Sequence, residues 1–479
     1  MKRTPLCLQP IVAALAFSLL TAAAEQPPSS PALTAAAQQD LLAPDAQLKI
    51  DKAASDTLAE TGAPGASIAV VKDGKLTYVH AYGVADVGSR KAATTAMHYS
   101  IGSISKQFTA AAVLLLAKDG KLSLDDKVGR WLPDITRAGD VTVRQLLSMT
   151  AGYQDYWPQD YVMPSLMQPT SAQGILDGWA RKPLDFQPGT KWQYSNTNYV
   201  IAGLIVERTA GTPLVDFLHR RIFEPLEMRS VVNTDFAALP AGEPTRYQRF
   251  GLGPVRLAPK EGKGWMFAAG ELAMTATDLA KWDISVINQT VLKPTSHREM
   301  QKNVQLSNGV ASRYGLGVGV NIVNGRRVIS HGGGVSGFTA QNSVYPDERA
   351  AIIVLTNLDA TNAAEKMVTK IADVLFTPAG SQDSLTEARD IFAGLQHGKI
   401  DRSRFTSNAN AYFSDQALKD FAASLAPLGK PSDFSQVAEE LRGGMTLHRY
   451  SARFPKKTLT VKTYITPDGK FEQYIVAAD

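Results

Sequence analysis

The chain has a single cysteine, and this scarcity excludes a common way of stabilising an exported protein. Cys7 lies near the start, inside the segment that we interpret below as an export signal. A mature chain without cysteine has no disulfide bonds, so its stability has to come from packed hydrophobic cores. With 479 residues, 44% of them hydrophobic, the chain is long enough for two or three domains with such cores.

Several catalytic and binding patterns are also absent. The sequence has no Gly-x-Ser-x-Gly elbow, which α/β-hydrolases need around their serine, and no His-Glu-x-x-His string, which many zinc peptidases use. The formal net charge is +5, and the sequence contains neither a basic block nor an arginine–aromatic alternation. We therefore expect no nucleic acid partner, no metal and no cofactor.

Long hydrophobic runs are likewise missing after the first residues. Lys2 and Arg3 precede an apolar run from Ile11 to Leu20, and the small residues 22–24 follow it. This order is typical of an export signal, and the run is shorter than the ~20 residues that span a bilayer. We predict a signal peptide over residues 1–24, a periplasmic or secreted protein, and no stable membrane span once the signal is removed.

The rest of the chain divides by composition. Residues 25–46 are rich in Ala, Pro, Gln and Ser and are predicted to form a flexible leader. We predict a main domain over residues 47–378 and a small C-terminal α+β domain of unknown role over residues 386–479. A linker of Thr, Pro, Gly and Ser residues separates them.

Strand-like runs lie near both ends of the main domain, with a long helical part between them. The first is a hairpin, Ser67–His80, around the favoured turn Asp73-Gly74. The later strands are expected over residues 315–320, 327–330, 338–345 and 350–356. The predicted fold class is therefore α/β (α+β), with one antiparallel sheet flanked by helices and a helical insertion.

Ser103 and Lys106 form the one Ser-x-x-Lys string of the chain, just before the apolar run Phe108–Leu116. If that run is a helix, residues three apart lie on one face and the amine can approach the hydroxyl. A serine becomes a good nucleophile only when a base takes its proton. Most such strings are a helix-capping serine and a surface lysine, so this spacing by itself is weak evidence.

Two further strings strengthen the case. Tyr194-Ser195-Asn196 precedes a helix predicted to begin near Tyr199, and His331-Gly-Gly-Gly334 follows the strand predicted over residues 327–330. Each string is common by itself, as a cap or as a turn. The occurrence of all three strings in this order, on these predicted elements, is a much more specific signal than any one of them.

Together the three strings resemble the motifs of the serine β-lactamase and penicillin-binding protein superfamily. The most similar branch contains class C β-lactamases, D-Ala-D-Ala carboxypeptidases, D-aminopeptidases and related esterases. The resemblance extends over about residues 48–376 and includes further matching strings: Tyr99–Ser103, Val143–Leu147, Pro188-Gly189 and Ala269-Gly270. It implies a β-lactamase/transpeptidase-like fold for the main domain.

The resemblance also implies roles for the matched residues. Ser103 would be acylated, and either Lys106 or Tyr194 would take its proton; the sequence leaves both possible. Asn196 would bind the acyl amide or hold the lysine. The backbone N–H groups of Ser103 and Gly334 would form the oxyanion hole, which typically contributes about 3–4 kcal/mol.

His331 stands, together with Gly333, at the third motif, where many β-lactamases and carboxypeptidases carry lysine. A histidine is mostly neutral at neutral pH, so it pairs less well with a substrate carboxylate. This departure favours an esterase, or a peptidase that acts on substrates containing D-amino acids, over an efficient β-lactamase.

The function expected is a secreted serine hydrolase acting through a Ser103 acyl-enzyme on an ester, amide or D-amino-acid peptide bond. Its partner would be a small-molecule or peptide substrate, and loops 153–170 and 247–266 are expected to line the pocket. One alternative is a penicillin-binding sensor that is acylated without turnover. Another places the function in the C-terminal domain. The sequence leaves the oligomeric state open.

Overall fold

The computed structural model describes residues 42–376, 384–466 and 469–478. The predicted signal peptide and most of the predicted leader lie outside the described residues. The helix α1 begins at Pro44, two residues before the predicted end of the leader. Within the described parts of the chain, no helix is both long and apolar enough to cross a membrane.

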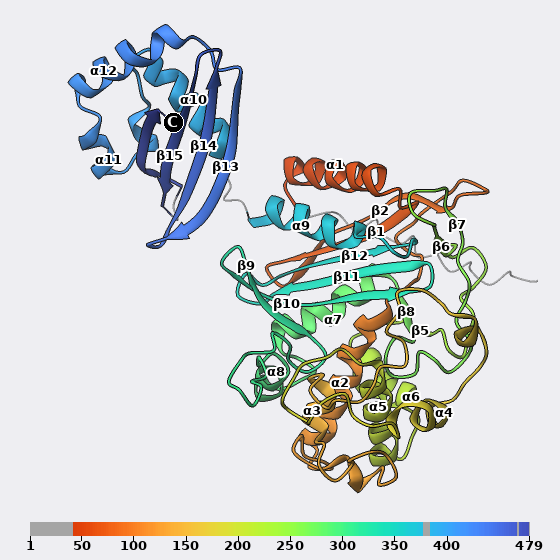
Figure 1. Cartoon of the computed structure of the whole chain (residues 1–479). Coiled ribbons are helices and arrows are strands. Elements are labelled where there is room, and N and C mark those ends of the chain that lie inside the picture. Colours follow the sequence, from red (N-terminus) through yellow and green to blue (C-terminus); the bar gives the residue numbers. More distant parts are fainter. Residues whose placement is uncertain (1–41, 377–383, 467–468, 479) are drawn as a thin grey trace, which may run out of the picture. The chain divides into compact units, whose positions relative to one another are not determined.

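A seven-stranded antiparallel sheet is the centre of the main domain (Figure 1). Its strands, in spatial order, are β3 (Lys91–Ala92), β2 (Lys75–Asp86), β1 (Gly65–Lys72), β12 (Ala350–Thr356), β11 (Phe338–Tyr345), β10 (Arg326–Val335) and β9 (Gly319–Val323). The first and last thirds of the domain meet where Ile68 lies opposite Val354. The prediction of one sheet built from distant segments is confirmed.

The hairpin between β1 and β2 forms because Asp73 and Gly74 both adopt positive φ angles, 54° and 72°. Two such residues make the tight turn that matches the twist of antiparallel strands. One expected strand is misplaced: β9 begins at Gly319, not at residue 315. At Gly317 a Cβ would lie 2.8 Å from the backbone oxygen of Lys106, so this stretch packs irregularly against helix α2.

Successive side chains of the central strands point to opposite faces of the sheet, so the core has two parts. Ile68 and Val70 point to one face of the sheet, which α1 (Pro44–Thr61) and α9 (Ala363–Phe376) cover. Ala69 belongs to the larger cluster on the other face. A strand with both faces buried is apolar throughout, which is why this run has no polar alternation.

Helix α7 (Ala276–Asn288) packs against that second face, and α2 (Ser105–Lys118) contributes to the same core. The other helices of this part are α3 (Val143–Leu147), α4 (Ala172–Ile175), α5 (Asn196–Ala210), α6 (Leu214–Leu218) and α8 (Pro294–Met300). Figure 1 shows α2, α3, α5 and α6 together on the side of the sheet opposite α1. They are the predicted helical insertion.

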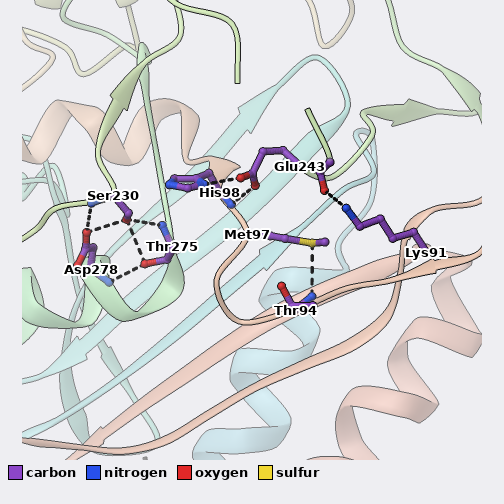
Figure 2. Close-up of polar contacts among 9 residues, drawn as sticks. Lys91, Thr94, Met97, His98, Ser230, Glu243, Thr275 and Asp278 are labelled. Carbon is purple, nitrogen blue, oxygen red and sulfur yellow. Dashed lines mark hydrogen bonds and ion pairs between the residues drawn. The ribbon is translucent and has the colours of Figure 1, made fainter. Parts of the chain in front are cut away.

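A long loop between the helical part and α7 contains four short strands, β5 (Val232–Asn233), β6 (Tyr247–Gln248), β7 (Arg256–Leu257) and β8 (Leu272–Met274). Strand β4 (Tyr99–Ser100), which precedes Ser103, pairs with β8. Side chains fasten the long loop at two points, as Figure 2 shows. The Glu243 carboxylate accepts the backbone N–H of His98 at 2.5 Å, and the Asp278 carboxylate accepts that of Ser230 at 2.7 Å. These bonds fix the loop that carries part of the site described below.

The C-terminal part has its own hydrophobic core and its own four-stranded antiparallel sheet. Its elements are α10 (Ser384–Gln396), α11 (Ser407–Tyr412), α12 (Asp415–Leu425), β13 (Asp433–Arg442), β14 (Met445–Phe454), β15 (Lys457–Ile465) and β16 (Phe471–Ala478). The sequence predicts helix over residues 387 to about 428 and a strand meander over residues 445–477, and it predicts no strand at β13. That strand lies at an edge and carries Gln436, Glu439 and Glu440, residues that are depleted in strands.

Candidate active site

Ser103 lies in a short 3₁₀ turn, Gly102–Ile104, between strand β4 and helix α2. The turn packs tightly against strand β10. A Cβ on Gly102, whose φ is +51°, would lie 2.8 Å from the backbone nitrogen of Gly334, and a Cβ on Gly333 would overlap the oxygen of Ile101. Glycine at these positions lets the two backbones approach, so the segments that carry the first and third motifs meet at the serine.

Lys106 is one turn further along and is fully buried. Its Nζ lies 2.9 Å from Ser103 Oγ, 2.8 Å from Asn196 Oδ1 and 2.7 Å from the backbone oxygen of Ala269. Burial lowers the pKa of Lys106 to about 7, although the nearby carboxyl groups of Asp155 and Glu271 oppose the shift. Near neutral pH, a large fraction of this amine is therefore uncharged.

Tyr194 approaches the serine from the segment before α5. Its Oη donates a hydrogen bond to Ser103 Oγ at 2.7 Å. Burial raises the pKa of the Tyr194 phenol above its ordinary value, and the nearby Asp155 charge adds to the shift. The phenol is therefore protonated at neutral pH and acts as a donor.

Asn196 is the first residue of α5, and its side chain is held on both sides. While its Oδ1 faces Lys106, its Nδ2 donates to Asp155 Oδ1 at 3.1 Å. Asp155 is a site residue that was not predicted from the sequence. It lies in an irregular loop 41 residues before Asn196, and no local pattern links the two positions.

His331 is buried in β10 behind the serine. Its Nδ1 lies 2.6 Å from the carbonyl oxygen of Gly332 and therefore donates, so Nε2 accepts from the Tyr314 hydroxyl at 2.9 Å. Burial lowers the pKa of His331 to about 4, and the Lys106 charge adds to the shift. Both ring nitrogens are thus occupied and the ring is neutral.

A cavity of about 770 Å³ opens above Ser103. Of the third-motif residues, Gly334 lines it, whereas His331 and Gly333 do not. The loop 155–162 forms one wall with the side chains of Trp157 and Tyr161, as the sequence predicted; from the second expected loop only Met266 lines the cavity.

Carboxylates dominate the charge of this cavity. Its lining includes Asp155, Asp160, Asp359 and Glu365, and no lysine or arginine among the described residues contributes to it. Across the same described residues, no group of three or more His, Cys, Asp or Glu side chains is arranged to hold a metal ion. The cavity therefore favours a ligand that presents a positive charge and disfavours one that presents a carboxylate.

Comparisons with known proteins identify the family of the chain. The Beta-lactamase family model matches residues 50–376. Penicillin-binding protein 4* of Bacillus subtilis (strain 168) is 28% identical over 342 residues, which cover 67% of this chain and 74% of the relative. A D-aminopeptidase of Brucella anthropi is 30% identical over 332 residues, which cover 67% of this chain and 62% of the relative.

A solved structure is similar over the same part of the chain. The D-amino acid amidase from Ochrobactrum anthropi SV3, complexed with D-phenylalanine, superposes with a TM-score of 0.63 at 26% identity. The match covers 69% of this chain and 99% of the amidase. The chain thus spans nearly all of the amidase but less than two thirds of the aminopeptidase.

Proposed function

The chain belongs to the β-lactamase family and is a serine hydrolase of that type, and we propose that it cleaves small D-amino-acid amides or esters with a free ammonium group. The observation that carries this proposal is the cavity at Ser103, which is lined by carboxylates and by no described lysine or arginine. An ammonium group on the substrate would be attracted by that lining. The similarity to a D-aminopeptidase and a D-amino acid amidase supports the same class of substrate.

In the proposed mechanism, Ser103 Oγ attacks the carbonyl carbon while the neutral amine of Lys106 takes the hydroxyl proton. The 2.9 Å separation of the two atoms allows this transfer, and the lowered pKa keeps the base available near pH 7. The negative charge that forms on the carbonyl oxygen would be bound by the N–H groups of Ser103 and Gly334.

Tyr194 has the complementary role in this proposal. Because its phenol is protonated, it is suited to give a proton to the leaving nitrogen or oxygen and not to act as the first base. The proton that it loses is replaced from the Lys106 ammonium, and a water molecule then attacks the acyl-enzyme in the reverse sense. Of the two bases that the sequence leaves possible, Lys106 and Tyr194, the proposal therefore assigns this role to the lysine.

His331 and Gly333 are proposed to support the site without binding the substrate. Both ring nitrogens of the histidine are hydrogen-bonded, one to Tyr314 and one to Gly332, and neither His331 nor Gly333 lines the cavity. The earlier reason for disfavouring carboxylate substrates was the missing lysine at position 331. The acidic lining of the cavity is a second, independent reason.

A matched set of substrates tests the proposal. Purified enzyme is given D-phenylalanine p-nitroanilide, its N-acetyl form and its L-enantiomer, together with a D-Ala-D-Ala peptide whose carboxylate is free. We expect the free-amine D-substrate to have the highest kcat/KM, and Glu365→Gln to raise KM for it more than for the N-acetyl form. Equal turnover of the free and acetylated amines would contradict the proposed specificity.

A penicillin-binding sensor is the second candidate, because the chain is 28% identical to penicillin-binding protein 4*. Such a protein would be acylated at Ser103 but would not release the acyl group. Labelling with a fluorescent penicillin, followed by measurement of the rate at which label is lost, separates the candidates. Stable label together with no turnover of any amide or ester would favour the sensor.

We further propose that the protein is exported to the periplasm or secreted. The support is the basic start followed by the short apolar run Ile11–Leu20. Mass spectrometry of the exported protein tests this, and a mature chain that begins at Glu25 is expected.

A further inference from the structure

Asp155 contacts the start of helix α5 through its carboxylate. Its Oδ1 accepts the backbone N–H of Asn196 at 2.9 Å and the side-chain Nδ2 of the same residue at 3.1 Å. The loop is fastened there a second time, because Thr197 Oγ1 donates to the backbone oxygen of Gln154 at 2.7 Å. The loop that lines the cavity is therefore held to the helix that carries Asn196.

This carboxylate takes the place of a helix cap. Ser195, the residue before α5, makes no side-chain capping bond, and its hydroxyl has no partner. The first N–H of the helix goes to Asp155 instead. A negative charge is favourable at a helix N-terminus, which gives a physical reason for an acid at this position.

The contact also decides which way the Asn196 amide points. An ionised carboxylate only accepts hydrogen bonds, so the amide must turn its Nδ2 toward Asp155. Its Oδ1 is then left to face Lys106 Nζ, at 2.8 Å. We propose that Asp155 is a positioning residue, which fixes the Asn196 amide and through it the position and proton state of Lys106; the inference rests on the proposed roles of Ser103 and Lys106.

The charge of Asp155 acts on the same lysine. The polar and titratable groups around the amine of Lys106 are Ser103, Asp155, Tyr194, Asn196, Tyr199, Glu271 and His331. Burial raises the pKa of Glu271 well above its ordinary value, which disfavours its charged form. Burial also raises the pKa of Asp155, but the N–H groups of Asn196 and Trp157 favour its ionised form. Both carboxyl groups favour the ammonium form of Lys106, and Asp155 has the larger effect.

The test is the rate at which a fluorophosphonate labels Ser103 between pH 5 and pH 9, because this probe requires no knowledge of the natural substrate. In Asp155→Ala, which removes both acceptor oxygens, we expect the plateau rate to fall on the order of 10- to 100-fold, since the amide is no longer oriented. We also expect the midpoint of the acid limb to move to lower pH, because a charge that favours the ammonium is gone. Asp134→Ala, at an exposed acid outside the cavity lining, is the matched control and should leave both unchanged.

A double-mutant cycle asks whether Asp155 acts through Asn196. Asn196→Ala keeps the backbone N–H that Asp155 accepts but removes the amide, so adding Asp155→Ala to it should lower the plateau little further. If Asp155→Ala is unfolded, as thermal unfolding would show, Asp155→Ser, whose hydroxyl can accept the helix N–H, replaces it in both measurements.

Two results would overturn the inference. One is a folded Asp155 variant with the pH profile and rate of the wild type. The other is a rate loss that leaves the acid limb unmoved and adds fully to that of Asn196→Ala, as a purely structural role would give. A wild-type protein that is not labelled at Ser103 would contradict the proposed function itself, so the two failures are distinguishable.

Discussion

At the scale of single residues, the site depends on a lysine amine that is taken out of water. Three acceptors surround Lys106 Nζ, namely Ser103 Oγ, Asn196 Oδ1 and the Ala269 oxygen, and burial outweighs the nearby carboxyls to bring its pKa to about 7. A lysine at its ordinary pKa of about 10.4 would be almost fully charged at neutral pH and unable to accept a proton.

The first prediction concerns the pH dependence of acylation. Only the neutral amine can act as the base, and its fraction rises with pH, so the rate should increase about tenfold per pH unit below the pKa of Lys106 and level off above about pH 7. The rate of fluorophosphonate labelling against pH measures this directly. Lys106→Arg, which stays protonated, should remove the reaction at every pH; an acid limb that persists in that variant would assign it to another group.

Local sequence predicted some of these residues and not others. Ser103 and Lys106 are three positions apart, so one turn of helix brings them together and their pairing could be read from the sequence. Tyr194 and Asn196 could be identified only through the resemblance to a family. Asp155 could not be found, since its partner lies far along the chain and a lone aspartate in a loop carries no signal of its own.

At the scale of elements, the serine turn and strand β10 are positioned by glycines that let one backbone lie on another. Gly333 and Gly334 are adjacent in β10 but have different surroundings. A Cβ at Gly333 would overlap the backbone oxygen of Ile101, whereas a Cβ at Gly334 would meet nothing within 4 Å. The same substitution at these two adjacent positions therefore separates the effect of the close backbone packing from the effect of adding a methyl group.

Gly333→Ala is predicted to lower both thermal stability and activity, because backbone atoms would have to move apart. Gly334→Ala should keep the stability of the wild type, since there is space for the methyl group. Differential scanning fluorimetry together with the labelling rate checks both. Equal stability of the two variants would contradict the close packing of the serine turn on β10.

Among the strands, sequence patterns predicted some positions well and others poorly. Strands β1 and β12 are apolar and were predicted almost to the residue, because burial on both faces leaves a clear pattern. Edge strand β13 is rich in polar residues and was missed. The start of β9 was misplaced because an irregular glycine-containing segment precedes it, and its path is set by contacts with α2.

At the scale of the whole molecule, the charge of the cavity is opposite to that of the chain. The chain has a formal net charge of +5, yet the lining of the cavity contains four carboxylates. The acidic lining is therefore a local property of the site and does not follow from the overall composition. The residues that line the cavity all lie between Ser103 and Glu365.

Because the cavity lining ends at Glu365 and helix α9 ends at Phe376, the C-terminal part supplies none of the residues described at the site. It also has a hydrophobic core of its own. A chain that ends after residue 376 is therefore predicted to fold and to keep the kcat/KM of the full chain for a small ester. A loss of more than about tenfold, equivalent to about 1.4 kcal/mol, would show that the C-terminal part contributes to the site.

The proposed chemistry requires that Ser103 is the residue that is acylated. Peptide mapping by mass spectrometry, after brief reaction with a stoichiometric fluorophosphonate, measures this most directly. We predict one adduct, on Ser103, which is absent from a folded Ser103→Ala variant. An adduct on a different residue, or unchanged labelling and hydrolysis in Ser103→Ala, would contradict the account.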